Sequence, residues 1–391
     1  MKPTKISIAV CEYNPFHNGH KLHLDRMREN GDVVALIMSG NFCQRGEPAI
    51  LDKYTRAEHA IKNGADIVFE LPAVFSVAPA EIFASGAIKL IDSLPGKKTL
   101  FFGTEGGTCQ DFTTLANILL TETKAFKENL KANLQTGIPH AKARQIAYET
   151  TYPDTDFSLL SMPNAVLGLE YTKALLKAKS TTQIQTIARN SGYNDLSLSG
   201  ETASALAIRN AILDGKKKKI KKFVPENVYN DLPDKICSFD DIMLFKAIES
   251  SKQQLRLITD CTEGLENRIK TFATSSKNLE DFIDKLETKR YTRARLKRII
   301  TCNTLSITRD LQEKCLKSNL YLKVLAIRAD KLNLLSSFSG GKHKLITRKL
   351  DIDTLSGTQK QCFLKDVYAN DIYNLVAKTK TNEYEMRIVK I

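Results

Sequence analysis

Three of the chain's six histidines lie within seven residues, in the stretch CEYNPFHNGHKLHL (11–24). His17 and His20 flank Asn18-Gly19, and Gly19 leaves space for a ligand to approach the backbone. Imidazoles at the start of a helix can hydrogen-bond phosphate oxygens and stabilise charge that develops at phosphorus. A metal site is the rival for three histidines, but no acidic ligand pattern of the HExxH type follows. His17 and His20 are therefore candidate catalytic residues for substitution at a phosphate.

The segments around this motif predict a strand before it and a helix after it. ISIAVC (6–11) is an uninterrupted apolar run, typical of a parallel strand buried on both faces, and a helix is expected from about His20 to Asn30. Further strands and helices alternate along the next part of the chain. The expected strands are 32–40, 65–72, 97–105 and 181–190, and the expected helices are 51–64, 76–94, 162–180 and 199–215. This alternation predicts an α/β fold with a Rossmann-like, doubly wound parallel sheet, whose ligands bind at the carboxyl ends of the strands.

The positive charge of the chain is confined to its second half. The net charge is +14, yet the first 215 residues hold 22 basic and 22 acidic side chains, and the remainder holds 36 and 22. One-sided positive charge favours a polyanionic partner, with nucleic acid first. We place a domain boundary at the lysine run, between an N-terminal domain (1–215) and a basic, mainly helical region (216–391). Long amphipathic helices are expected over 239–335 and a small strand-bearing unit in the last 50 residues, while the lysine run 216–222 is either an RNA contact or a flexible linker.

The composition favours a soluble, cytoplasmic protein without a membrane partner. No apolar stretch reaches the roughly 20 residues that a membrane helix needs. The first residues have no signal-peptide core. Eight scattered cysteines without a CxxC pair point to a reducing compartment and give no metal-ligand pattern.

The order strand, HxGH, helix resembles the nucleotidyltransferases that include the small adenylyltransferases and class I aminoacyl-tRNA synthetases. Four longer blocks narrow the resemblance: EYNPFHNGH, SGNFCQRGEPAILDKYTRAEHAIKNGADIVFELP, FFGTEGG and MPNAVLGLEY. They resemble the bacterial tRNA(Met) cytidine acetate ligase family, through residues 6–210 and again at TEGLENRI (262–269) and TKRYTRARLKRII (288–300).

That resemblance implies a two-step reaction. ATP, entering with Mg²⁺, and acetate would form acetyl-adenylate, and the acetyl group would pass to N4 of the wobble cytidine (C34) of elongator tRNA(Met), without acetyl-coenzyme A. The residues leave two other functions open. One is a small-molecule adenylyltransferase of the pantetheine or nicotinamide mononucleotide type, and the other is a non-catalytic RNA-binding protein on a nucleotide-binding fold. The oligomeric state also stays open.

The resemblance also implies a set of ATP-binding residues. From the strand through the motif they are Ser7, Ile8, Ala9, Val10, Cys11, Glu12, Tyr13, Asn14, Pro15, Phe16, His17, Asn18, Gly19 and His20, and beyond it Gly103, Asn164 and Arg189. Without the resemblance, a helix cap is the favoured interpretation of Asn164 and a surface ion pair that of Arg189.

Two arginines are candidate anion or phosphate ligands. Arg45 lies in the charged turn of SGNFCQRGEPA, which either is simply solvated or holds acetate, pyrophosphate or magnesium. Lys53 and Arg56 on the next helix are weaker candidates. Arg209 ends ASALAIR (203–209), which departs from the ISSTxIR-like signature of many adenylyltransferases because Ala205 and Leu206 replace hydroxyl residues. No protein side chain is predicted as a metal ligand.

A basic segment in the second half is the candidate tRNA-binding surface. Basic side chains neutralise phosphates, and an aromatic ring can stack on an unpaired base. In LETKRYTRARLKRII (286–300), Tyr291 either stacks or is packed in the protein. The basic residues of the segment are Lys289, Arg290, Arg293, Arg295, Lys297 and Arg298.

Overall fold

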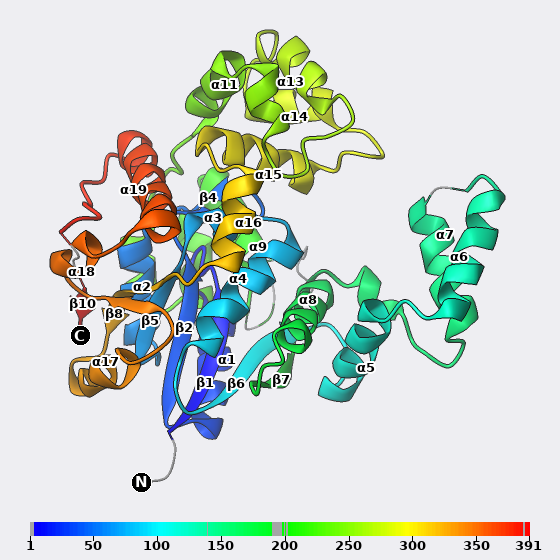
Figure 1. Cartoon of the computed structure of the whole chain (residues 1–391). Coiled ribbons are helices and arrows are strands. Elements are labelled where there is room, and N and C mark those ends of the chain that lie inside the picture. The colour runs from blue at the N-terminus through cyan, green and yellow to red at the C-terminus, as the bar shows by residue number, and fades with distance from the viewer. Residues whose placement is uncertain (1–3, 139, 190–197, 199, 201, 386–387) are drawn as a thin grey trace.

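A central β-sheet with helices on both faces forms the body of the protein (Figure 1). The structure is a computed structural model that describes residues 4–138, 140–189, 198, 200, 202–385 and 388–391. Among these residues the strand order is β10-β8-β5-β2-β1-β6-β7, with β9 paired to β8, and β3 and β4 form a separate small ribbon. The strands are β1 (Lys5–Cys11), β2 (Val33–Ser39), β3 (Phe42–Cys43), β4 (Glu47–Pro48), β5 (Ile67–Leu71), β6 (Lys97–Thr104), β7 (Gln183–Ala188), β8 (Tyr321–Ile327), β9 (Lys344–Ile346) and β10 (Val389–Lys390).

The predicted α/β class is confirmed, since the strands β5-β2-β1-β6-β7 are parallel to one another. Their side chains alternate between two cores. In β2, Val33 and Ile37 face one core, and Val34 and Met38 face the other. This burial on both faces explains why the strands are continuous apolar runs in the sequence.

The helices cover the sheet and build the rest of the chain. In chain order they are α1 (Asn18–Asn30), α2 (Lys53–Lys62), α3 (Ala73–Ser76), α4 (Ala80–Asp92), α5 (Cys109–Leu120), α6 (Lys124–Gln135), α7 (His140–Thr151), α8 (Pro163–Lys177), α9 (Ala205–Leu213), α10 (Glu226–Asp231), α11 (Asp240–Glu249), α12 (Lys252–Arg256), α13 (Leu265–Ala273), α14 (Leu279–Leu286), α15 (Arg293–Thr304), α16 (Arg309–Lys317), α17 (Asn333–Phe338), α18 (Lys349–Asp353) and α19 (Gly357–Ala377). Short 3₁₀ helices are η1 (Ser158–Ser161), η2 (Lys217–Phe223) and η3 (Ala329–Lys331). The pair α6–α7 projects from the body as an arm (Figure 1).

Several element boundaries differ from expectation. The first helix begins at Asn18 and not at His20, because His17 caps it. The helix expected over 199–215 begins at Ala205, and positions 199 and 201 lie outside the described residues. Among the described helices, none has both the length and the apolar content that crossing a membrane would require.

The second half of the chain contributes directly to the sheet, which was not expected. Residues Tyr321–Ile327, placed by their pattern in a helical region, form strand β8, which pairs antiparallel with β5. Strands β9 and β10 both pair with β8, so the strand-bearing unit expected in the last 50 residues exists but extends the main sheet. A division at residue 215 stays a prediction, and the sheet is built from both sides of it.

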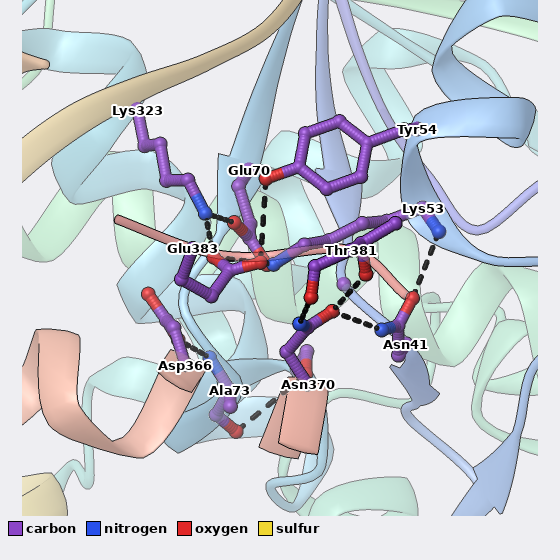
Figure 2. A network of polar contacts seen from close by, with 12 residues as sticks. Asn41, Lys53, Tyr54, Glu70, Ala73, Lys323, Asp366, Asn370, Thr381 and Glu383 are labelled. Carbon is purple, nitrogen blue, oxygen red and sulfur yellow. Dashed lines mark hydrogen bonds and ion pairs between the residues drawn. The ribbon is translucent and has the colours of Figure 1, made fainter. Parts of the chain in front are cut away.

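A buried ion cluster fixes the C-terminal segment to this sheet (Figure 2). Lys53 Nζ lies 2.6 Å from a Glu70 carboxylate oxygen and 2.9 Å from one of Glu383. Lys323 of β8 contacts the same two carboxylates, at 2.8 Å from Glu70. All four side chains are at most 2% exposed, so the two positive and two negative charges balance within the protein interior.

Candidate active site at the carboxyl edge of the sheet

The candidate site lies where the strand order reverses. The chain runs from β1 outward through β2 to β5, then returns to β6 on the other side of β1 and continues to β7. Such a switch point leaves a crevice at the carboxyl ends of the strands. Cys11 ends β1, Thr104 ends β6, and Arg189 follows the last residue of β7. The stretch 12–20, Gly103 and Arg189 are thus brought to one edge, as predicted.

His17 and His20 form a stacked pair at the N-terminus of α1. Their ring centroids lie 3.6 Å apart, with 25° between the planes. His17 is the N-cap: its Nδ1 accepts from the Gly19 N–H at 3.1 Å, and the His17 N–H donates to His20 Nδ1 at 3.2 Å. This reciprocal arrangement satisfies backbone donors at the helix start and fixes both rings.

The same hydrogen bonds assign the tautomers of the two rings. In each imidazole Nδ1 accepts a backbone N–H, so in the neutral ring the proton resides on Nε2. Burial, together with the nearby Arg189 charge, lowers the pKa of His17 to about 3. Burial and the His17 ring also lower the pKa of His20 well below its ordinary value. Both rings are therefore neutral near pH 7 and present Nε2–H groups as hydrogen-bond donors.

Arg189 packs against the end of β6. A Cβ built on Gly103 would lie 3.0 Å from both Cγ and Cδ of Arg189, so the absence of a side chain at Gly103 admits the arginine. Its charge also contributes to the low pKa of His23, about 4, after the effect of burial. The site therefore combines neutral imidazole donors with a nearby guanidinium group.

In the rest of the segment 7–20, the first residues are enclosed in the sheet and those after Cys11 form a turn. Ser7, Ile8 and Ala9 are at most 1% exposed inside the sheet, so their side chains are enclosed by protein. After Cys11 the chain turns sharply at Tyr13, whose φ of +49° is left-handed. The Asn14 Oδ1 accepts the Ile50 N–H at 2.9 Å and so ties this turn to the next loop.

The loop that carries Arg45 is fixed to the same edge. The Gln44 N–H donates to Glu12 Oε1 at 2.7 Å, and burial raises the pKa of the Glu12 carboxyl. Arg45 is half-buried beside this contact. Of the weaker anion candidates, Arg56 is fully buried and donates to the carbonyls of Leu51 and Ser39, among others, and Lys53 belongs to the buried ion cluster. Those two residues therefore serve the structure of the loop.

Arg209 lies against the turn that follows β1. Its Nη1 donates to the Asn14 carbonyl at 2.8 Å, and its Nη2 lies 3.4 Å from a Glu47 carboxylate oxygen. Ser204 caps α9 by accepting the Ala207 N–H at 3.0 Å. The structure thus brings Arg209 to the site edge, where part of its hydrogen-bonding capacity is engaged by the protein.

Asn164 is held by a carboxylate that the sequence did not single out. Glu105, after β6, accepts the Asn164 Nδ2–H at 2.6 Å and the Asn164 N–H at 3.2 Å with one oxygen. Its other oxygen accepts the Ala165 N–H at 3.2 Å. Glu105 therefore caps α8 from a distant loop, and only the fold, not a local pattern, reveals it.

The basic segment around α15 reaches the same edge, but much of its charge is balanced internally. Gly46 has a φ of +74°, and a Cβ built on it would lie 2.4 Å from the backbone nitrogen of Arg298. The loop and α15 are therefore in backbone contact. Lys297 pairs with Glu47 at 3.1 Å, and Arg293 contacts three carboxylates, including Glu287 at 3.2 Å.

The other residues of this segment differ in their exposure. Tyr291 is 5% exposed and donates its hydroxyl to the Thr262 carbonyl at 3.0 Å, so it is packed and does not present its ring for stacking. Arg295 donates to the Asp260 carbonyl at 2.6 Å, and Arg298 is half-buried. Lys289 and Arg290 are exposed, and Arg290 pairs with Glu263 at 3.2 Å.

A doubly wound sheet with an HxGH helix start at its switch point defines a nucleotidyltransferase of the HIGH class. A family model described as HIGH Nucleotidyl Transferase matches residues 4–387. The tRNA(Met) cytidine acetate ligase of Caldanaerobacter subterraneus is 37% identical over 94% of this chain and 94% of its own, and that of Listeria monocytogenes is 35% identical over 97% and 96%. The chain belongs to the tRNA(Met) cytidine acetate ligase family and is an enzyme of the ligase class.

Solved structures agree with this assignment. Thermotoga maritima TmcAL bound with alpha-thio ATP has a TM-score of 0.87 and 28% identity, covering 99% of this chain and 100% of its own. The apo form of the same protein has a TM-score of 0.90 with the same coverage. The fold is thus shared over essentially the full described length.

Proposed function

We propose that the chain uses ATP to acetylate N4 of the wobble cytidine (C34) of elongator tRNA(Met), through an acetyl-adenylate. The observation that carries the proposal is the stacked His17–His20 pair at the N-terminus of α1, with two Nε2–H donors beside Arg189. The names of the relatives, and the ATP analogue bound by the Thermotoga maritima protein, support the substrates.

In the first step a carboxylate oxygen of acetate attacks the α-phosphorus of ATP, and the bond to pyrophosphate breaks. The Nε2–H groups of His17 and His20 donate to phosphate oxygens as negative charge accumulates there. The positive end of the α1 helix dipole adds to this stabilisation. Because both rings are neutral, they act as hydrogen-bond donors and need not transfer a proton.

In the second step the N4 amine attacks the acetyl carbon, the carbon–oxygen bond to AMP breaks, and N4 loses a proton. An exocyclic amine conjugated with the ring is a weak nucleophile, so an activated acyl donor suits this chemistry. Mg²⁺ would arrive with the triphosphate. Within the described part of the chain, no cluster of three or more His, Cys, Asp or Glu side chains could hold a metal ion.

The test is nucleoside mass spectrometry of tRNA(Met) incubated with the protein, ATP and isotopically labelled acetate, without acetyl-coenzyme A. Labelled N4-acetylcytidine is expected, and an absolute need for acetyl-coenzyme A would overturn the proposal. His20→Ala is the informative variant, because alanine removes the imidazole and with it the Nε2–H donor, while the N-cap bond that His17 Nδ1 accepts from the Gly19 N–H stays in place. Acetate-dependent exchange of pyrophosphate into ATP should fall by roughly 10²-fold or more, with tRNA binding retained.

A further inference from the structure

The lysine run is an ordered helix and not a flexible linker. Residues Lys217–Phe223 form the 3₁₀ helix η2, which packs against α9 and α10. A 3₁₀ helix has three residues per turn, so positions 217, 220 and 223 share one face. Ile220 and Phe223 on that face are 0% and 1% exposed and belong to the core beneath α1, α2 and α9. This burial anchors the run to the body of the protein.

The two other faces of η2 are made of lysine alone. Lys218 and Lys221 form one row, and Lys219 and Lys222 form the other, and all four are exposed. The adjacent Lys216 and Lys217 pair with Asp214 at 2.7 Å and Asp234 at 3.1 Å. No carboxylate among the described residues forms an ion pair with any lysine of the two rows. Four unneutralised charges are therefore displayed on a fixed scaffold.

A hydrogen bond joins this scaffold to the catalytic motif. Asn18, between His17 and His20, donates its side-chain N–H to the Lys222 carbonyl at 2.9 Å. The end of η2 therefore lies within hydrogen-bond distance of the first residue of α1. Lysines on one row are about 6 Å apart along the helix axis, a spacing suited to successive phosphates of one strand. By contrast, Arg293 and Lys297 of α15 are already paired with carboxylates.

We propose that the two lysine rows of η2 bind the phosphodiester backbone of the substrate RNA and guide the target nucleotide to the His17–His20 pair. The proposal rests on the proposed function, because it takes tRNA(Met) as the substrate. Together the two rows, Lys218, Lys219, Lys221 and Lys222, are called the rail below. Positive charges that follow an RNA backbone beside the reacting groups give affinity without base specificity. The Asn18 contact gives the rail a fixed position relative to the pair.

The test compares two variants with the same change in charge. The rail variant carries Lys218→Gln, Lys219→Gln, Lys221→Gln and Lys222→Gln, which keep Ile220 and Phe223. The control variant replaces four exposed lysines around α17–α19 in the same way. These control positions are Lys342, Lys349, Lys378 and Lys380. Binding of a tRNA(Met) transcript is measured between 50 and 300 mM KCl, and acetate-dependent pyrophosphate exchange is measured without RNA.

The rail variant should bind tRNA at least about tenfold more weakly near 0.1 M salt, with the slope of log affinity against log salt reduced by about 3. The control variant should change both by less than about half as much, and exchange should be normal in both. Equal effects on tRNA binding in the two variants, or no effect in the rail variant, would overturn the proposed RNA-binding role of these lysines. So would a raised KM for ATP in the exchange assay with unchanged tRNA binding, which would assign the lysines to the triphosphate. If the unmodified protein shows no acetate-dependent exchange of pyrophosphate into ATP, the proposed function is refuted instead.

Discussion

The charge state of the imidazole pair makes a quantitative prediction about acid stability. His17 is 5% exposed, and burial with the Arg189 charge lowers its pKa to about 3. In the unfolded chain the imidazole has an ordinary pKa of about 6.5. As the pH falls below about 6.5, protons therefore bind the unfolded chain first. The contribution of neutral His17 to the unfolding free energy is therefore complete above that pH, and it is lost on acidification toward the folded-state pKa.

The magnitude follows from the two pKa values. At pH 5, about 1.5 pH units below the unfolded-state pKa, His17 alone should cost about 2 kcal/mol of unfolding free energy. The full effect, reached near pH 3, is about 5 kcal/mol. His17→Asn removes the titrating ring but keeps a side-chain acceptor suited to the N-cap, whose hydrogen bond runs from the Gly19 N–H.

Urea unfolding at pH 8, 7, 6 and 5 measures this difference directly. The unmodified protein should lose about 2 kcal/mol more than His17→Asn between pH 8 and pH 5. His23 and His343 also have lowered pKa values, but His17 does not cause them, so they are the same in both proteins and cancel in the comparison. The same pH dependence in both proteins would show that His17 titrates normally, and the assignment of a neutral Nε2–H donor would then be wrong.

Three further variants test how the edge of the sheet is held together. Gly46→Ala should lower the unfolding free energy well beyond Gly137→Ala. Both glycines have a left-handed φ, which costs an alanine about 1 kcal/mol, but only at Gly46 would a Cβ lie 2.4 Å from the α15 backbone. Equal losses of unfolding free energy in urea would contradict that contact. Glu105→Gln should cost about 1–2 kcal/mol by weakening the α8 cap, and an unchanged melting temperature would contradict it. Lys323→Met should cost about 3–5 kcal/mol by leaving buried carboxylates underpaired, and adding Glu383→Leu should recover part of that loss in the same assay.

The parallel strands could be predicted from the sequence, because doubly buried strands are apolar runs, and parallel topology then places the candidate site residues at their carboxyl edge. Strand β8 could not be predicted in this way. Its segment YLKVLAI contains Lys323, whose burial depends on Glu70 and Glu383, and these partners are brought by distant parts of the chain. Taken alone, the segment counts the lysine as a solvent-facing position, so its burial in a strand has no local signal.

The site residues divide in the same way. His17 and His20 follow the end of β1, Gly103 lies one residue before the end of β6, and Arg189 follows β7. Their placement at one edge follows from parallel topology. The internal pairing of Lys297 and the packing of Tyr291 depend on how α15 docks against the rest of the fold, for which the sequence gives no local signal.

The loop at the candidate active-site edge is not built by the first half of the chain alone. Asn41 accepts the Lys53 N–H at 2.8 Å and donates to Asn370 Oδ1 of α19 at 3.0 Å (Figure 2). Asn370 in turn donates to the Thr381 carbonyl at 2.8 Å, two residues before Glu383 of the ion cluster. Residues more than 300 positions apart therefore fix the loop that carries Arg45, and the last segment of the chain is part of the support of the active-site edge. An N-terminal fragment ending near residue 215 would contain every candidate ATP-binding residue, yet it would lack β8, the Asn370 contact and half of the ion cluster that hold their loops in place.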